Sequence, residues 1–238
     1  MRYLVSSDLH YSLPQLDWIA DQAAEFDAVI LAGDHLDAGG HADLQAQIAL
    51  TVAYLGKLAE RTTVIANSGN HDLTARRADG EKAATWLDRI DERVISDGAN
   101  VRVGDDLVSA CAWWEGPATR SEVEEQLDAA AAIDRPGRWI WVYHSPPDAS
   151  PTAWSGRRHF GDDLLNALIE RHAPDIVITG HVHEAPFRPD GSWFDRIGST
   201  LVTNAGRHLG PMPAHLILDT ATGEVSWWSA NGRGELSI

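Results

Sequence analysis

Hydrophobic positions in the first third of the chain follow two alternating periods. Short, nearly continuous apolar runs predict buried strands, at residues 2–7, 29–32 and 62–66. Between these runs, apolar residues recur every three to four positions and predict helices, at residues 13–26 and 42–60. A β-α-β-α-β order of this kind predicts a parallel sheet with right-handed crossovers.

The rest of the chain continues the alternation and then changes character. Further strands are predicted at residues 106–113, 138–144 and 175–179, and further helices at about 121–133 and at 162–172. The helical period is lost after residue 195, where antiparallel strands are predicted at 195–203, 215–219 and 224–228. The pattern therefore predicts one α/β domain over residues 1–238, with a sheet that becomes antiparallel late.

Composition narrows the class of protein. A hydrophobic content of 44% and a charged content of 23% are typical of a soluble globular protein. The first residues enter a strand directly, so no signal peptide is expected, and no apolar run approaches the roughly 18 residues of a membrane span. The single Cys111 fits a reducing compartment, and a cytoplasmic location is expected.

Charge narrows the possible partners. The net charge of −16 disfavours binding to duplex nucleic acid or to an anionic membrane surface. An acidic protein that handles phosphate must neutralise it locally, with metal ions or a few arginines.

Metal-capable residues follow five of the predicted strands. Each one alone is more typical of a turn or a helix cap. Because the carboxyl ends of strands in an open α/β sheet form its ligand site, the residues are predicted to converge when taken together. The five blocks are Asp8-x-His10, Gly33-Asp34-x-x-Asp37, Gly69-Asn70-His71-Asp72, His144 and Gly180-His181-x-His183.

These five blocks, in this order, resemble the signature of the calcineurin-like metallophosphoesterases, and the resemblance runs from residue 8 to about residue 206. It implies a four-layer αββα sandwich, in which two stacked mixed sheets are flanked by helices. It also implies two metal ions that share Asp34. The ligands implied for the first metal are Asp8, His10, Asp34 and His183, and those for the second are Asp34, Asn70, His144 and His181.

The implied ligands and their neighbours suggest a chemistry. Imidazoles, carboxylates and one amide oxygen, without thiolates, suit Mn or Fe, with Zn, Ni or Co as alternatives. Two such ions activate a bridging hydroxide for attack on phosphorus. In this mapping His71 protonates the leaving group and Asp37 orients it. Asp72 is an alternative partner of His71, or else caps the turn.

Candidate substrate contacts are indicated by their position next to the metal blocks. They are His35, Arg157, Arg158, His159 and His208, with Arg207 as an alternative to the last. Trp113 and Trp114 are expected in the core, or less readily as an apolar wall of the site.

The function that fits these features is hydrolysis of a cyclic nucleotide or another small phosphodiester. Alternatives are a phosphomonoesterase acting on a small phosphorylated metabolite, and a catalytically silent interaction module on the same fold. A protein phosphatase is disfavoured because Ala38 stands where that branch of the family has an arginine. A nuclease is disfavoured by the acidic charge.

Overall fold

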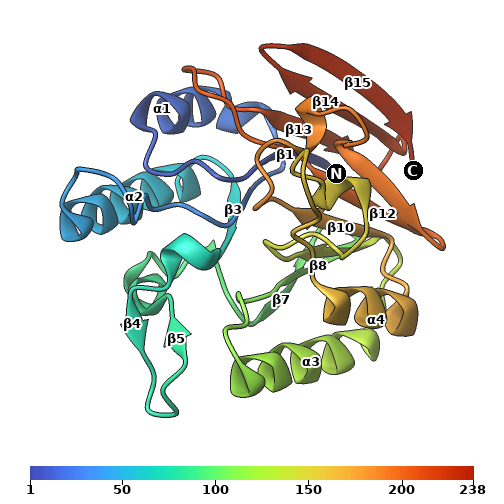
Figure 1. The fold of residues 1–238 in the computed structure, drawn as a ribbon, viewed down its shortest axis with the longest axis horizontal. Helices are drawn as coiled ribbons and strands as arrows, with labels where there is room; N and C mark the ends of the chain where they lie inside the picture. The colour runs from blue at the N-terminus through green and yellow to red at the C-terminus, as the bar shows by residue number, and fades with distance from the viewer.

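The computed structural model describes residues 1–238, and two large β-sheets stacked face to face form its centre (Figure 1). The first sheet has the order β15-β14-β13-β1-β2-β3-β6. Its strands are β1 (Arg2–Ser6), β2 (Ala28–Ala32), β3 (Thr63–Asn67), β6 (Val94–Ile95), β13 (His215–Asp219), β14 (Glu224–Ser229) and β15 (Gly232–Ser237).

The second sheet has the order β11-β12-β10-β9-β8-β7. Its strands are β7 (Ala99–Val103), β8 (Asp106–Ala110), β9 (Trp139–Val142), β10 (Ile176–Thr179), β11 (Phe194–Ile197) and β12 (Thr200–Asn204). A separate two-stranded hairpin, β4 (Ala75–Arg76) with β5 (Lys82–Ala83), projects from the layers (Figure 1).

Helices cover the outer face of each sheet, which gives the four-layer αββα arrangement. Two of them, α1 (Leu13–Gln22) and α2 (Leu44–Ala59), pack on the first sheet. The other two, α3 (Pro117–Ala131) and α4 (Asp163–His172), pack on the second sheet. The sequence resemblance predicted this fold, and the structure confirms it. None of the four helices is long and apolar enough to span a membrane.

Period-2 alternation explains how the central strands hold the layers together. All of β2 is buried, and successive side chains point to opposite faces of its sheet. Ile30 packs in the cluster between the two sheets, whereas Val29 packs in the cluster beneath α1 and α2. The parallel register of β1, β2 and β3 aligns their carboxyl ends at one edge.

The long-range architecture differs from the prediction made from periodicity alone. That prediction placed every strand in one sheet, which is wrong, because β7–β12 form a second sheet. The segment predicted as one strand at 195–203 is a hairpin that turns at Gly198 (φ 59°), and its second strand pairs parallel with β10. The strand predicted to reach Trp113 ends at Ala110.

Helix α3 begins at Pro117 rather than near 121, because its cap comes from a distant residue. Glu81 accepts hydrogen bonds from the backbone N–H groups of Ala118 and Thr119 at 2.8 and 2.9 Å. These donors have no partner inside the helix. A cap supplied from 37 positions away leaves no local signal in the sequence.

Candidate metal centre

The loops that follow β1, β2 and β3 of the first sheet meet those that follow β9 and β10 of the second sheet. Backbone bonds join neighbouring loops: the N–H of His10 donates to the carbonyl of Asp34 at 2.9 Å, and the N–H of Gly180 donates to that of His144 at 2.8 Å. The carboxylate of Asp8 accepts the N–H of His181 at 3.0 Å and so connects the two sheets.

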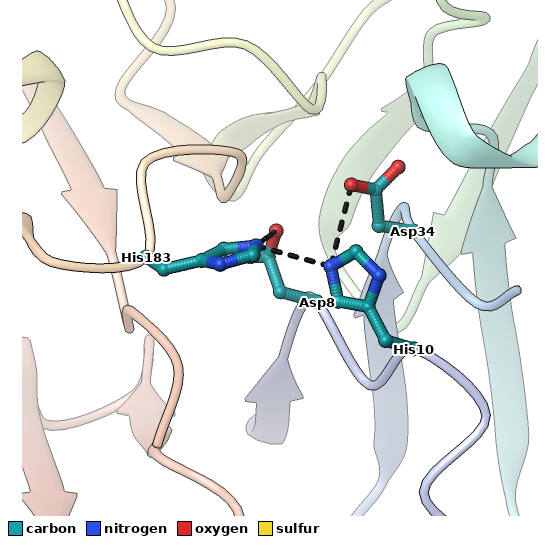
Figure 2. Close-up of side chains that lie close together, drawn as sticks. All are labelled: Asp8, His10, Asp34 and His183. Atoms are coloured by element: carbon teal, nitrogen blue, oxygen red, sulfur yellow. Dashed lines mark hydrogen bonds and ion pairs between the residues drawn. The ribbon is translucent and has the colours of Figure 1, made fainter. Parts of the chain in front are cut away.

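A first group of side chains gathers around Asp8 and contains His10, Asp34 and His183 (Figure 2). One ligand atom from each lies within 4.8 Å of the others. His183 Nε2 is 3.2 Å from an Asp8 oxygen, and His10 Nε2 is 3.0 Å from His183 Nε2 and 3.6 Å from Asp34 Oδ2. These are the four residues expected around the first metal.

A second group shares Asp34 with the first. Ligand atoms of Asp34, His144 and His181 also lie within 4.8 Å of one another. His144 Nε2 is 3.1 Å from Asp34 Oδ2, and His181 Nδ1 is 2.9 Å from the side-chain oxygen of Asn70. The structure thus brings together all seven side chains expected to bind metal, with Asp34 at their junction.

The hydrogen-bond partners of His144 indicate whether the second group of side chains can bind a cation. Its Nδ1 lies 2.7 Å from the carbonyl oxygen of Ala32, which can only accept, so Nδ1 carries the proton. In the neutral ring, Nε2 then directs a lone pair at Asp34 and Asp8, and this buried atom has no hydrogen-bond partner. A lone pair facing two carboxylates requires a positive charge, either a proton or a metal ion, between them.

The pKa of His144 reflects this need for a positive charge beside the two carboxylates. Burial by itself would lower the pKa, but the negative charges of Asp34 and Asp8 raise it to about 10. Burial lowers the pKa values of His10 and His181 to about 4, which leaves both rings neutral at pH 7. The donor set therefore fits a divalent transition metal.

The carboxylates of the centre are held in their ionised form. Burial would raise the pKa of Asp8, but the charge of His144 and a hydrogen bond from His183 lower it to about 2. The pKa of Asp34 is also lowered; against the opposing effect of burial, the charge of His144 and a 2.9 Å hydrogen bond from the N–H of His71 favour the carboxylate.

Backbone strain is concentrated at these residues. Asp8, His10, Asp34 and His181 all have positive φ values, of 55°, 42°, 54° and 66°. Left-handed backbone costs a non-glycine residue roughly 1 kcal/mol or more, so it persists only where surrounding structure enforces it. Gly33 (φ 81°) ends β2 just before Asp34, and a Cβ atom there would lie only 2.6 Å from Cγ of His144.

Asp72 serves the backbone rather than His71. Its fully buried carboxylate accepts N–H groups from His35, Leu36 and Gly69 at 3.0, 3.1 and 2.9 Å. It therefore joins the loop after β2 to the loop after β3. The alternative role as partner of His71 is wrong, and the turn-capping role fits.

His71 and Asp37 lie beside the first group. The ring of His71 stands edge-on to that of His10 with centroids 4.7 Å apart, and ligand atoms of His10, His71 and Asp37 lie within 4.8 Å of one another. No hydrogen bond joins His71 to Asp37, and the buried Nδ1 of His71 has no partner. Gln47 of α2 fixes the Asp37 backbone through bonds of 2.8 and 3.1 Å, a contact the sequence did not reveal.

Four of the candidate substrate contacts have their hydrogen-bond or ring partners outside the two metal-binding groups. His35 is buried, with Nε2 2.9 Å from the Asn67 carbonyl oxygen and its ring against Trp86, so its expected substrate role is wrong. His208 accepts the N–H of Ala230 at 3.3 Å. His159 packs on Trp154, and Arg158 lies over the ring of Phe160.

Two of the candidates lie close to the metal-binding groups, Arg157 and Arg207. Arg207 donates its backbone N–H to the carbonyl of His183 at 3.0 Å, and its charge helps to lower the pKa of His10, after the larger effect of burial. Arg157 has a different place. It lines a cavity of about 500 Å³ together with His181, His183 and Arg188. The sequence pattern did not reveal Arg188, which follows the short helix η5 (Ala185–Phe187) and has no motif of its own.

The two tryptophans expected in the core have different places. Trp114 stacks on Tyr143 in the core, with centroids 3.8 Å apart. Trp113 lies against the imidazoles of His144 and His181, with centroid distances of 5.8 and 5.3 Å. Trp113 therefore forms an apolar wall of the centre.

Comparisons with known proteins agree with this geometry. The chain matches the family model described as calcineurin-like phosphoesterase over residues 1–185. No curated protein sequence matches it. The chain belongs to the calcineurin-like phosphoesterase family.

Solved structures share the fold at low sequence identity. The protein TT1561 of Thermus thermophilus is 17% identical with a TM-score of 0.58, and 99% of this chain and 98% of that chain are covered. Purple acid phosphatase PPD1 from yellow lupin is 14% identical with a TM-score of 0.60, over 95% of this chain and 50% of that chain. The phosphoesterase YfcE from E. coli is 15% identical with a TM-score of 0.50, over 100% of both chains.

Proposed function

We propose that the chain is a metal-dependent phosphodiesterase that hydrolyses a cyclic nucleotide or another small phosphodiester. The observation that carries the proposal is the position of Asp34, whose carboxylate belongs to both groups of metal-capable side chains. A carboxylate in this position is suited to bridging two ions. Asp8, His10 and His183 would complete the first set, and Asn70, His144 and His181 the second.

Manganese or iron is favoured for both positions, with zinc, nickel or cobalt as alternatives. When bound, two such ions supply Lewis-acid polarisation of the phosphoryl group and acidify water. A chain with net charge −16 needs this local positive charge to accept an anionic ester.

The remaining residues have roles in orientation, proton transfer and exclusion of water. His71 is placed to give a proton to the departing oxygen, and its backbone N–H fixes the Asp34 carboxylate at 2.9 Å. Asp37 lies close enough to orient the His71 ring once a substrate is bound. Trp113 shields His144 and His181 from solvent, which strengthens their electrostatic interactions.

A diester is preferred over a monoester because organic groups can be accommodated at two places. The cavity beside His181 and His183 offers space for one group. His71, which does not line that cavity, would protonate the oxygen of the other group.

The cytoplasmic location expected from the sequence stays a prediction.

The test compares turnover of bis(4-nitrophenyl) phosphate and 4-nitrophenyl phosphate by protein loaded with Mn²⁺, followed by a panel of cyclic nucleotides. The diester is expected to be hydrolysed faster, and His144→Ala is the inactive control. Activity on the monoester alone would refute the diester assignment and favour a phosphomonoesterase. Absence of turnover with either ester, despite two bound ions per chain, would refute the enzymatic assignment.

A further inference from the structure

The cavity beside His181 and His183 contains cationic groups that the hydrolysis itself does not require. Arg157 and Arg188 both line it, together with one carboxylate, Glu184. The same two arginines also line an adjoining hollow of about 330 Å³, together with one carboxylate, Asp190. The cavity therefore carries an excess of positive charge in a protein whose net charge is −16.

Neither arginine has an acidic partner of its own. The arginines that form ion pairs within 4.0 Å are Arg77, Arg93, Arg138 and Arg171. Two guanidinium groups without an ion pair that line the same cavity are available to bind an anion. Guanidinium groups bind carboxylate and phosphate in a directional, often bidentate manner.

Local structure brings the two side chains together. Arg157 lies in a tight turn, in which Ser155 Oγ donates to the carbonyl of Arg158 at 2.7 Å. Gly156 (φ 87°) lies in the same turn, and a Cβ atom at this position would lie 3.2 Å from Cδ of Arg188. The aliphatic part of Arg188 thus crosses directly over the turn that carries Arg157.

Further contacts fix the turn and give the cavity an apolar wall. The indole N–H of Trp154 donates to the carbonyl of Pro189 at 3.0 Å, which ties the turn to the segment after Arg188. Phe160 is 41% exposed and lines the same cavity. Arg158 lies over one face of this ring. A flat organic group could pack on the other face while its anionic substituent reaches Arg157 and Arg188.

We propose that Arg157 and Arg188 determine specificity for a phosphoester whose organic group carries a second anion, a carboxylate or a phosphate. The scissile phosphoryl group would lie at the metal-binding residues and the second anion at the arginines. This inference rests on the proposed function, because it places the ester at His181 and His183. It adds the chemical class of the substrate.

The test measures binding of two non-hydrolysable probes, phenylphosphonate and 4-carboxyphenylphosphonate, to Mn²⁺-loaded protein by isothermal titration calorimetry at low salt. The wild-type chain should bind the carboxylated probe about tenfold more tightly, equivalent to about 1.4 kcal/mol. Arg157→Gln and Arg188→Gln should each lose most of this preference and keep their affinity for phenylphosphonate.

Arg158→Gln is the matched control, because it removes the same charge from the same turn but from a side chain that lies over Phe160, 4.1 Å from the ring centre. It should retain the preference, because any change at the Phe160 ring acts equally on two probes that share the same aryl group. Equal affinities of the two probes for the wild type, no binding of either probe, or a preference that survives in both Arg157→Gln and Arg188→Gln would overturn the proposal. Because neither probe is hydrolysed, the binding preference can be measured whether or not the protein turns over bis(4-nitrophenyl) phosphate. The failure of this proposal can therefore be distinguished from the failure of the proposed function.

Discussion

Metal binding at the second group should depend on pH through a single proton, the one held by His144. The charges of Asp34 and Asp8 raise the pKa of His144 to about 10, from an ordinary value of 6.5. At neutral pH the metal-free protein therefore carries a proton where the ion would bind. Burial keeps the pKa values of His10 and His181 near 4, so neither of these competing groups titrates above pH 7.

The size of the pH effect on metal affinity follows from the pKa of His144. Between pH 7 and pH 9, the apparent affinity for Mn²⁺ should rise about tenfold per pH unit, or about a hundredfold overall, since one proton must leave. Anaerobic titration calorimetry in two buffers of different ionisation enthalpy measures both the affinity and the number of protons released. His144→Gln should bind more weakly at pH 9 and show little dependence on pH.

Stability of the metal-free protein should change in the opposite direction. Because the pKa of His144 is raised in the folded state, its protonation stabilises the folded state fully below pH 6.5. This contribution is lost as the pH rises through 10. Between pH 7 and pH 9 the free energy of unfolding should fall by about 2–3 kcal/mol, or about 5–10 °C in Tm for a chain of this size. An affinity that changes less than threefold over this range, with no proton released, would refute the assignment of charge to His144.

Three substitutions test other parts of the centre. His71→Ala should keep both metal ions, measured by elemental analysis, and should slow esters with poor leaving groups at least tenfold more than those with good ones; an equal loss for all esters would contradict its role as proton donor. Gly33→Ala should destabilise the fold by about 1–3 kcal/mol in urea titration, because it combines a positive φ with a Cβ atom that displaces His144, and unchanged stability would refute the packing argument. Asp72→Ala should lower stability by about 2–5 kcal/mol by orphaning three buried N–H groups, and metal affinity should fall with it; loss of affinity alone would identify Asp72 as a direct ligand.

The positions of the metal-capable side chains could be predicted because their placement is largely local. Each follows a short apolar run, and buried strands deliver the residues at their carboxyl ends to one edge. The structure places Asp8, Asp34 and His144 at that edge, although His144 comes from a different sheet. The division into two sheets was not visible in the apolar pattern, because residues such as Ile30 and Ile140 look alike whichever sheet they belong to.

The sequence-based predictions of residue roles were wrong where the role depends on the direction of a side chain or on a partner far away in the sequence. His35 is adjacent to Asp34, but its ring points to Trp86 and the carbonyl of Asn67 instead of the centre. Asp72 acts on backbone groups of the loop after β2, 36 and 37 positions away, which no spacing pattern encodes. Arg188 is 31 positions from Arg157 in the sequence and lines the cavity because its side chain crosses the turn at Gly156, so it could be recognised only in three dimensions.

In the proposed function, Asp34 would be the carboxylate shared by two metal ions. Elemental analysis of the wild-type chain after loading with Mn²⁺ and removal of free metal should give two ions per chain, whereas Asp34→Asn should give fewer than one and no measurable turnover of bis(4-nitrophenyl) phosphate. Both groups of ligands should be weakened together because they share this carboxylate. Two tightly bound ions and full turnover in Asp34→Asn would show that Asp34 is not shared by two ions.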